Sequence, residues 1–131
     1  MIADDDASDV FFLREALKES CPSCRVFDVS DGQQAMDYLL GRNEFSDRAR
    51  HPLPTDLFLD IKMPRRTGLE VLRWLRSQKD LGQIPVAILS GSKLDKDVNL
   101  ALSLGAVYLV KPVDYGELRR MISDYVASRC P

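Results

Sequence analysis

The chain has 131 residues, of which 45% are hydrophobic, and a formal net charge of −2 at pH 7. This length suits one domain, so we expect residues 1–131 to form a single unit. The charge offers no attraction to nucleic-acid phosphates or anionic lipid, and no apolar run could span a bilayer, which excludes nucleic acid and membrane as expected partners. Because the N-terminus turns acidic at once, it does not resemble a secretory signal, and we expect a cytoplasmic protein.

Short apolar runs alternate with amphipathic stretches along the chain. In chain order, the pattern predicts strand 1–3, helix 7–20, strand 25–29, helix 33–40, a long polar loop at 42–55, strand 56–60, helix 69–79, strand 85–90, helix 95–104, strand 107–110 and helix 115–128. This alternation predicts an α/β fold with a parallel sheet, helices on both faces and right-handed crossovers. The first strand is unusually short, so we expect it to be truncated at its N-terminus.

The first predicted helix has one apolar face. Phe12, Leu13, Ala16 and Leu17 lie on that face and are expected in the core. Phe11 lies off the face and is expected to be exposed. Asp6 or Ser8 is expected to cap the start of the helix, and an acidic first turn also suits the helix dipole.

The three cysteines are Cys21, Cys24 and Cys130. An odd number argues against a secreted disulfide scaffold. Cys21 and Cys24 have the spacing of a redox or zinc motif, but they follow a predicted helix instead of preceding one, and no second Cys/His pair completes a zinc site. We therefore predict reduced cysteines in a turn.

Polar side chains follow four of the predicted strands at their carboxyl ends. Asp4 and Asp5 follow the first strand, Asp60 ends the third, Ser90 ends the fourth and Lys111 follows the fifth. Ligands of such sheets bind beyond the carboxyl ends of the strands, so we expect these groups to share one crevice. Each alone could be a cap, a surface charge or a turn former. Their joint placement is what indicates a site.

The grouped carboxylates need more positive charge than Lys111 supplies. Mg²⁺ takes oxygen ligands and suits Asp4 and Asp5, which leaves an oxygen of Asp60 free beside it. Such a carboxylate can attack phosphorus and form an aspartyl phosphate. Lys111, the Ser90 hydroxyl and backbone N–H groups near Lys62 would stabilise the transition state.

The only histidine, His51, lies in the long loop and is predicted to be solvated. No base is therefore predicted for a serine or cysteine nucleophile.

The chain resembles the response-regulator receiver family over essentially its whole length. The resemblance is carried by the segments 2–6 (IADDD), 59–64 (LDIKMP) with Gly68, 89–91 (LSG) and 108–112 (YLVKP). It implies a flavodoxin-like, doubly wound, five-stranded parallel sheet of order 2-1-3-4-5 with five helices. It also implies a signalling domain that catalyses only its own phosphorylation and dephosphorylation, and is otherwise no enzyme.

The resemblance assigns a role to each matching position. It implies Asp60 as phospho-acceptor and metal ligand, Asp4 and Asp5 as the acidic pair around Mg²⁺, and the Lys62 backbone carbonyl as a further metal ligand. It also implies Ser90 and Tyr108 as switch residues, Lys111 as the phosphoryl-binding lysine, and a cis bond between Lys111 and Pro112. Tyr108 could instead be a half-buried aromatic with its hydroxyl in water.

The implied partner is a sensor histidine kinase or a phosphotransfer protein. The segments 6–10, 31–35 and 42–55 also resemble the small stand-alone receivers that partner bacterial phytochromes, which would make the kinase light-sensing. Exposed Phe11 either helps to dock the kinase or is an incidental surface aromatic. A homodimer through the face of the fourth helix, fifth strand and fifth helix is a further expectation.

Two rival functions remain open. A phosphatase of the haloacid-dehalogenase type also uses an aspartate nucleophile and Mg²⁺, but it needs a second aspartate where Lys62 stands and a cap domain or a longer core. A receiver-like module that binds partners without phosphorylation would not need the intact set of Asp4, Asp5, Asp60, Ser90 and Lys111.

Overall fold

The fold is described from a computed structural model, which covers residues 1–129; Cys130 and Pro131 lie outside the described residues. The strands are β1 (Ile2–Ala3), β2 (Asp28–Val29), β3 (Leu57–Leu59), β4 (Val86–Ser90) and β5 (Val107–Val110). The helices are α1 (Ala7–Ser20), α2 (Gly32–Leu40), the 3₁₀ turn η1 (Asn43–Phe45), α3 (Gly68–Ser77), α4 (Asp95–Ser103) and α5 (Tyr115–Arg129). The predicted elements are all present, and α1 and β5 have the predicted bounds.

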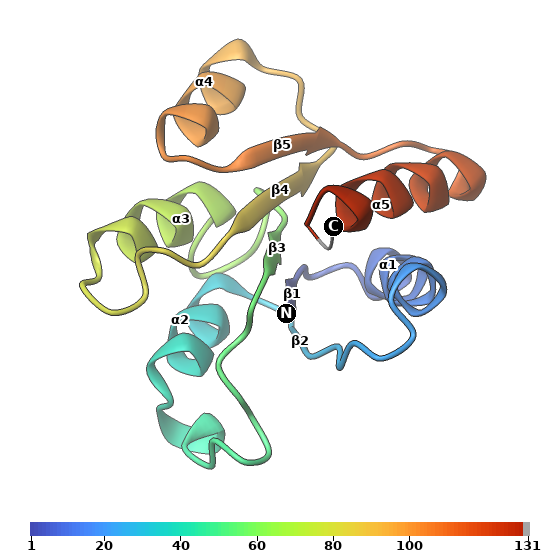
Figure 1. Cartoon of the computed structure of the whole chain (residues 1–131). Helices are drawn as coiled ribbons and strands as arrows, with labels where there is room; N and C mark the ends of the chain where they lie inside the picture. Colours follow the sequence, from blue (N-terminus) through green and yellow to red (C-terminus); the bar gives the residue numbers. More distant parts are fainter. Residues whose placement is uncertain (130–131) are drawn as a thin grey trace.

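The strands form one sheet in the order β2-β1-β3-β4-β5, and all four neighbouring pairs are parallel. This confirms the predicted order. The helices α1 and α5 lie side by side on one face, while α2, α3 and α4 cover the other (Figure 1). Because every strand runs the same way, the carboxyl ends of all five meet at one edge. Within residues 1–129, no helix is both long and apolar enough to cross a bilayer.

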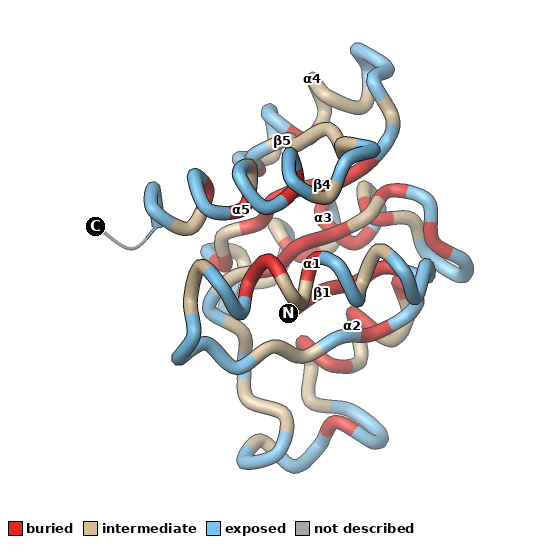
Figure 2. Tube along the Cα trace, turned by 90° about the vertical axis from the view of Figure 1, so that its right-hand side faces the viewer, coloured by how far each residue is buried: buried red, intermediate tan, exposed pale blue. Residues whose placement is uncertain are grey.

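The sheet separates two apolar clusters. Alternate side chains of a strand point to opposite faces, so Ile2, Phe58, Ala87 and Leu89 pack with α1 and α5, whereas their neighbours along the strands pack with α2, α3 and α4. The strands β3 and β4 are buried over their whole length, and Figure 2 shows the buried segments in the middle of the molecule. Burial on both faces explains why these strands read as continuous apolar runs.

Side chains cap the first three α-helices that lead away from the carboxyl edge. Asp6 accepts hydrogen bonds from the backbone N–H groups of Ser8 and Asp9 and so begins α1, as predicted. Asp31 caps α2, and Thr67 forms a capping box with Glu70 at the start of α3. These caps fix where α1, α2 and α3 begin.

Two sequence-based expectations about α1 and β2 are wrong. The strand predicted at 25–29 shortens to Asp28–Val29, because its sheet neighbour β1 is only two residues long. Phe12, predicted in the core, is 43% exposed and contacts Tyr115 of α5 at 5.2 Å between ring centroids. The helix α1 turns Leu13, Ala16 and Leu17 inward, which places Phe12 on the rim between α1 and α5.

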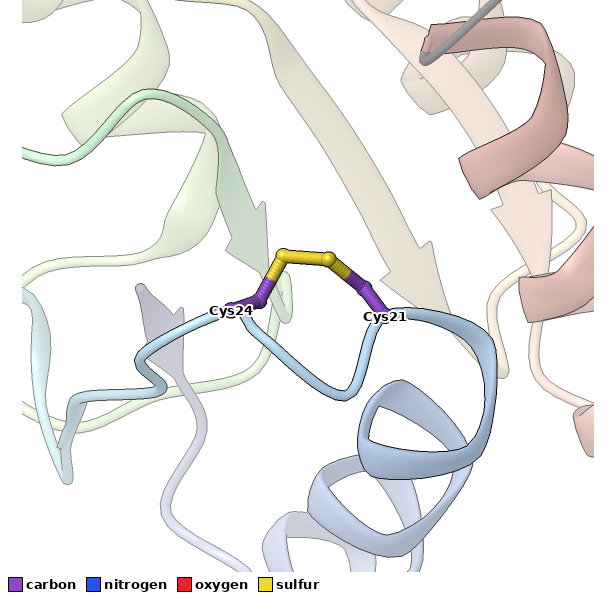
Figure 3. The surroundings of a disulfide bond; sticks show 2 residues. All are labelled: Cys21 and Cys24. Atoms are coloured by element: carbon purple, nitrogen blue, oxygen red, sulfur yellow. A yellow bond between two sulfur atoms is a disulfide. The ribbon is translucent and has the colours of Figure 1, made fainter.

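The cysteine prediction is also wrong. Cys21 and Cys24 form a disulfide in the turn after α1 (Figure 3). The Cys24 N–H donates to the Cys21 carbonyl at 3.0 Å, and this turn holds the two Cα atoms 5.4 Å apart, a separation that a disulfide spans readily.

The long loop at 42–55 is folded against α2. His51, predicted to be solvated, is half-buried and packs edge-on against the rings of Tyr38 and Phe45. The Tyr38 hydroxyl donates to the Pro52 carbonyl at 2.9 Å. Arg48 donates to the carbonyls of Tyr38 and Leu39 at 2.8 Å each, and so satisfies the C-terminus of α2.

Candidate functional site

Three aspartates converge at the carboxyl edge of the sheet. Asp4 and Asp5 follow β1, and Asp60 follows the adjacent strand β3. One carboxylate oxygen of each lies within 4.8 Å of the others. Asp4 is buried and Asp5 is exposed, so the cluster opens to solvent on one side. The backbone of Gly68 packs on the Asp60 carbonyl so closely that a Cβ there would come within 2.1 Å of it.

Lys111 enters the cluster from the end of β5. Its ammonium donates to Asp4 at 2.9 Å and to Asp9 at 2.8 Å, and it lies 3.7 Å from an oxygen of Asp60. Burial lowers the pKa of Lys111, but the hydrogen bonds that it donates to Asp9 and Asp4 and the surrounding negative charge outweigh burial, so the net shift of the pKa is upward. Lys111 is therefore a permanent cation at this edge.

The carboxyl of Asp60 is hard to ionise. Burial raises its pKa from 3.8 to about 6, with Asp4 and Asp5 adding to the rise, while Lys111 and the Ile61 N–H lower it. One lysine thus fails to compensate the negative charge of the cluster. A divalent cation held by Asp4, Asp5 and Asp60 would do so, and a set of oxygen donors this close suits such a hard ion.

Ser90 and Tyr108 lie on β4 and β5 beside this cluster. Ser90 ends β4, is 2% exposed, and its hydroxyl accepts the Ser92 N–H at 3.3 Å. The Tyr108 hydroxyl donates to the Ser92 carbonyl at 2.8 Å, so the suggestion that it points into water is wrong. Ser92 therefore connects the two predicted switch residues through its backbone. Lys111 is tied to the same strand, since its N–H donates to the Ser90 carbonyl at 2.8 Å.

The loop from β3 to α3 borders the crevice. Lys62 lies in it with an exposed side chain. Arg65 has a left-handed backbone with φ of 66°, which is uncommon for a residue other than glycine, and its guanidinium donates to the buried Asp31 at 2.9 Å. This ion pair fastens the loop to the N-terminus of α2.

The expected cis bond before Pro112 is wrong, because every peptide bond within residues 1–129 is trans. The isomers of a bond preceding proline differ by only about 0.5–1 kcal/mol, so sequence alone does not decide between them.

The structure thus places Asp4, Asp5, Asp60, Ser90 and Lys111 at one edge, as the strand ends predicted. Sequence reasoning missed Asp9, Ser92 and the Asp31–Arg65 pair. Asp9 had a detectable signal, because it is an acid in the first turn of the helix that directly follows Asp4 and Asp5. The Asp31–Arg65 contact joins residues 34 apart in sequence and had none.

Comparison with known proteins identifies the family. The response regulator receiver domain model matches residues 1–123. The chain belongs to this family. Receivers are phospho-acceptor domains of two-component signalling, which operate with a kinase or phosphotransfer partner and are not enzymes in the ordinary sense. A plant protein is among the relatives of this chain. The Arabidopsis thaliana two-component response regulator ARR17 is 29% identical over 92% of this chain and 80% of its own length.

Solved receivers share the fold closely. The response regulator Rcp1 of Synechocystis sp. is 29% identical over 93% of this receiver and 82% of its own chain, and its Mn²⁺-bound form superposes with a TM-score of 0.85 over 94% and 87% of the two chains. The phosphorylated cyanobacterial phytochrome response regulator RcpA, at 29% identity, has a TM-score of 0.87 over 95% and 87%. RPA3017, of red-light signalling in R. palustris, is 36% identical, with a TM-score of 0.85 over 95% and 87%.

Proposed function

We propose that Asp60 is the phospho-acceptor of this receiver, and that its carboxylate holds Mg²⁺ together with Asp4, Asp5 and the Lys62 carbonyl. The observation that carries the proposal is the convergence of the three carboxylates within 4.8 Å, with the Lys111 ammonium 3.7 Å from Asp60. The raised pKa of Asp60, about 6, fits a carboxylate that ionises easily only when a cation lies beside it. The Mn²⁺-bound relative Rcp1 supports a divalent cation at this edge.

The reaction is transfer of a phosphoryl group between two nucleophiles. An oxygen of Asp60 attacks the phosphorus of a phosphohistidine on the donor, the P–N bond breaks, and the imidazole leaves with the electron pair and takes up a proton. Later a water attacks the acyl phosphate, the bond between phosphorus and the Asp60 oxygen breaks, and inorganic phosphate leaves. A bound divalent cation would neutralise the phosphoryl oxygens and draw down the pKa of Asp60.

Lys111 and Ser90 would contact the phosphoryl group once it is attached. Lys111 supplies a positive charge and Ser90 a hydroxyl, and both stabilise the charge that develops on the phosphoryl oxygens. When Ser90 turns toward the phosphoryl group it gives up the Ser92 N–H that it now accepts, and Ser92 is also the partner of Tyr108. Tyr108 can then move inward and change the face formed by α4, β5 and α5.

The donor partner is proposed to be a cytoplasmic sensor histidine kinase, or a phosphotransfer protein, in a light pathway that contains a phytochrome. The support is the similarity to RcpA and RPA3017. Phe11 is 57% exposed on α1, beside the similarly exposed Phe12, and is the proposed docking contact. Transfer from the cognate kinase that proceeds unchanged in Phe11→Ala would remove Phe11 from this interface.

A homodimer through the α4–β5–α5 face is the proposed assembly. Its support is the exposure of Leu102 and Val107 on that face, at 55% and 44%. Sedimentation of the phosphorylated and unphosphorylated chain tests it, and a monomer in both states would reject it.

Incubation with acetyl phosphate and Mg²⁺ tests the central proposal. Intact-mass spectrometry should show the gain of one phosphoryl group, labile to hydroxylamine as acyl phosphates are, and Asp60→Asn should show none. The same assay separates the rivals. Steady hydrolysis of many phosphate esters would indicate the phosphatase, and a chain that takes up no phosphoryl group would be the module that binds partners without phosphorylation.

A further inference from the structure

The ammonium of Lys111 is held by two carboxylates, those of Asp4 and Asp9. A lysine ammonium has three N–H donors. One donates to Asp4 at 2.9 Å and one to Asp9 at 2.8 Å. Asp4 directly follows β1, and Asp9 lies in the first turn of α1, so the ammonium is fixed between a strand end and a helix. The third N–H donor remains available on the side of Asp60.

The distance to Asp60 is the informative quantity. At 3.7 Å the ammonium is too far from the Asp60 oxygen for a charge-assisted hydrogen bond, which is about 2.7–2.9 Å long. A phosphoryl group joined to Asp60 would carry its own oxygens outward from that carboxylate, toward the space in front of the ammonium. In the unphosphorylated state, Lys111 is therefore not hydrogen-bonded to the Asp60 nucleophile. Its separation from Asp60 leaves room for the phosphoryl oxygens of phosphorylated Asp60.

We propose that Asp9 is a positioning residue that holds the Lys111 ammonium away from Asp60 and ready for the phosphoryl group. Without Asp9, the lysine would be free to move onto Asp60, whose carboxylate is 3.7 Å away and has no hydrogen bond to it. A direct hydrogen bond there would tie up the oxygen that attacks phosphorus. The inference deepens the proposed function and rests on it, since it concerns how that same site is kept competent.

Asp9 could instead serve only the helix. It is an acid in the first turn of α1, where the helix dipole favours negative charge, and its own N–H donates to the Asp6 cap at 3.1 Å. That role would make Asp9 matter for stability and leave Lys111 where it is. The two roles of Asp9 can therefore be distinguished by the position of Lys111. A role in helix stability alone would leave that position unchanged when Asp9 is replaced.

The experiment compares three variants of the full chain. Asp9→Asn removes the charge with little change of shape, and Asp9→Glu keeps it. Glu15→Gln is the matched control, because Glu15 is on the same helix and its ion-pair partner is Lys18, at 3.6 Å, instead of Lys111. The rate of phosphorylation by acetyl phosphate with Mg²⁺ should fall on the order of tenfold in Asp9→Asn, recover at least in part in Asp9→Glu, and stay at the wild-type value in Glu15→Gln.

A second measurement does not depend on activity. In crystals of the metal-free Asp9→Asn chain, the distance from Lys111 Nζ to the Asp60 carboxylate should shorten from 3.7 Å to hydrogen-bond length. A lysine that stays in place, or an Asp9→Asn rate equal to that of the wild type, would overturn the positioning role and leave the phospho-acceptor intact. A wild-type chain that takes up no phosphoryl group would overturn the proposed function, and this inference with it.

Discussion

Two regions of the molecule hold partly buried cations that differ in their hydrogen-bond acceptors. Arg76, in the last turn of α3, donates to the carbonyls of Leu104, Gly82 and Ile84 at 2.6, 3.0 and 2.7 Å. These acceptors are neutral backbone groups, and the guanidinium joins the loop between α3 and β4 to the C-terminus of α4. At the carboxyl edge, Lys111 faces only carboxylates, and one of them is left without a hydrogen bond to it.

This difference in acceptors indicates that Arg76 stabilises the fold, whereas Lys111 contributes to the proposed reaction. Around Arg76, polar groups satisfy one another, so nothing further is needed there. At the carboxyl edge, burial raises the pKa of Asp60, and the negative charges of Asp4 and Asp5 add to the rise. Because the carboxylates are not fully neutralised, a cation or phosphoryl group that binds among them should stabilise the folded protein.

Removing the supporting cation should have the largest effect on stability. Arg76→Met keeps most of the aliphatic stem but leaves three carbonyls without their donor, so the free energy of unfolding should fall by about 2–4 kcal/mol. Urea denaturation measures the loss. The phosphorylation rate of the protein that remains folded should be unchanged. A rate that falls in proportion to stability would mean that the two regions are coupled and that the contrast between them is wrong.

Asp60→Asn should raise the stability of the metal-free chain, whereas Arg76→Met should lower it. Because the pKa of Asp60 is raised from 3.8 to about 6, its proton is bound more tightly in the folded state, and the stability this gives is present below pH 3.8 and lost as pH rises through about 6. Asn removes the cost of the charge. The metal-free variant should therefore be about 1–2 kcal/mol more stable than wild type near neutral pH, after allowance for solvent screening, and the gain should vanish near pH 4.

Thermal unfolding across this pH range, with and without Mg²⁺, measures the difference. Mg²⁺ should stabilise wild type more than Asp60→Asn, because the variant has lost one of the three carboxylates. A variant that is less stable than wild type in metal-free buffer at neutral pH would show that Asp60 is not destabilised by its surroundings.

The fold was largely predictable because its signals are local or periodic. Strands buried on both faces give continuous apolar runs, and helices begin at caps such as Asp6 and Thr67. The carboxyl edge followed from the direction of the strands, which is why Asp4, Asp60 and Lys111 could be grouped from sequence.

What could not be predicted depends on contacts between distant segments. The exposure of Phe12 is decided by how α1 sits against α5, since periodicity cannot tell the centre of an apolar face from its rim. The Cys21–Cys24 disulfide depends on how tightly the turn after α1 closes. The hydrogen bonds of Lys111 depend on side-chain conformations that no spacing rule supplies, so Asp9 was found only in three dimensions.

The smallest effect on stability is expected at Tyr108, which lies on β5. Its ring is half-buried and its hydroxyl donates to the Ser92 carbonyl at 2.8 Å. Tyr108→Phe keeps the ring and removes only this hydrogen bond, so the unphosphorylated chain should lose about 0.5–1.5 kcal/mol of stability. Because that bond holds the ring in its resting place, the variant should change conformation more readily on phosphorylation. NMR spectra of the α4–β5 region should then lie closer to the phosphorylated state before any phosphoryl donor is added. Spectra that match the resting wild type would show that the Ser92 contact, unlike Lys111 and its carboxylates, belongs with the fold and not with the switch.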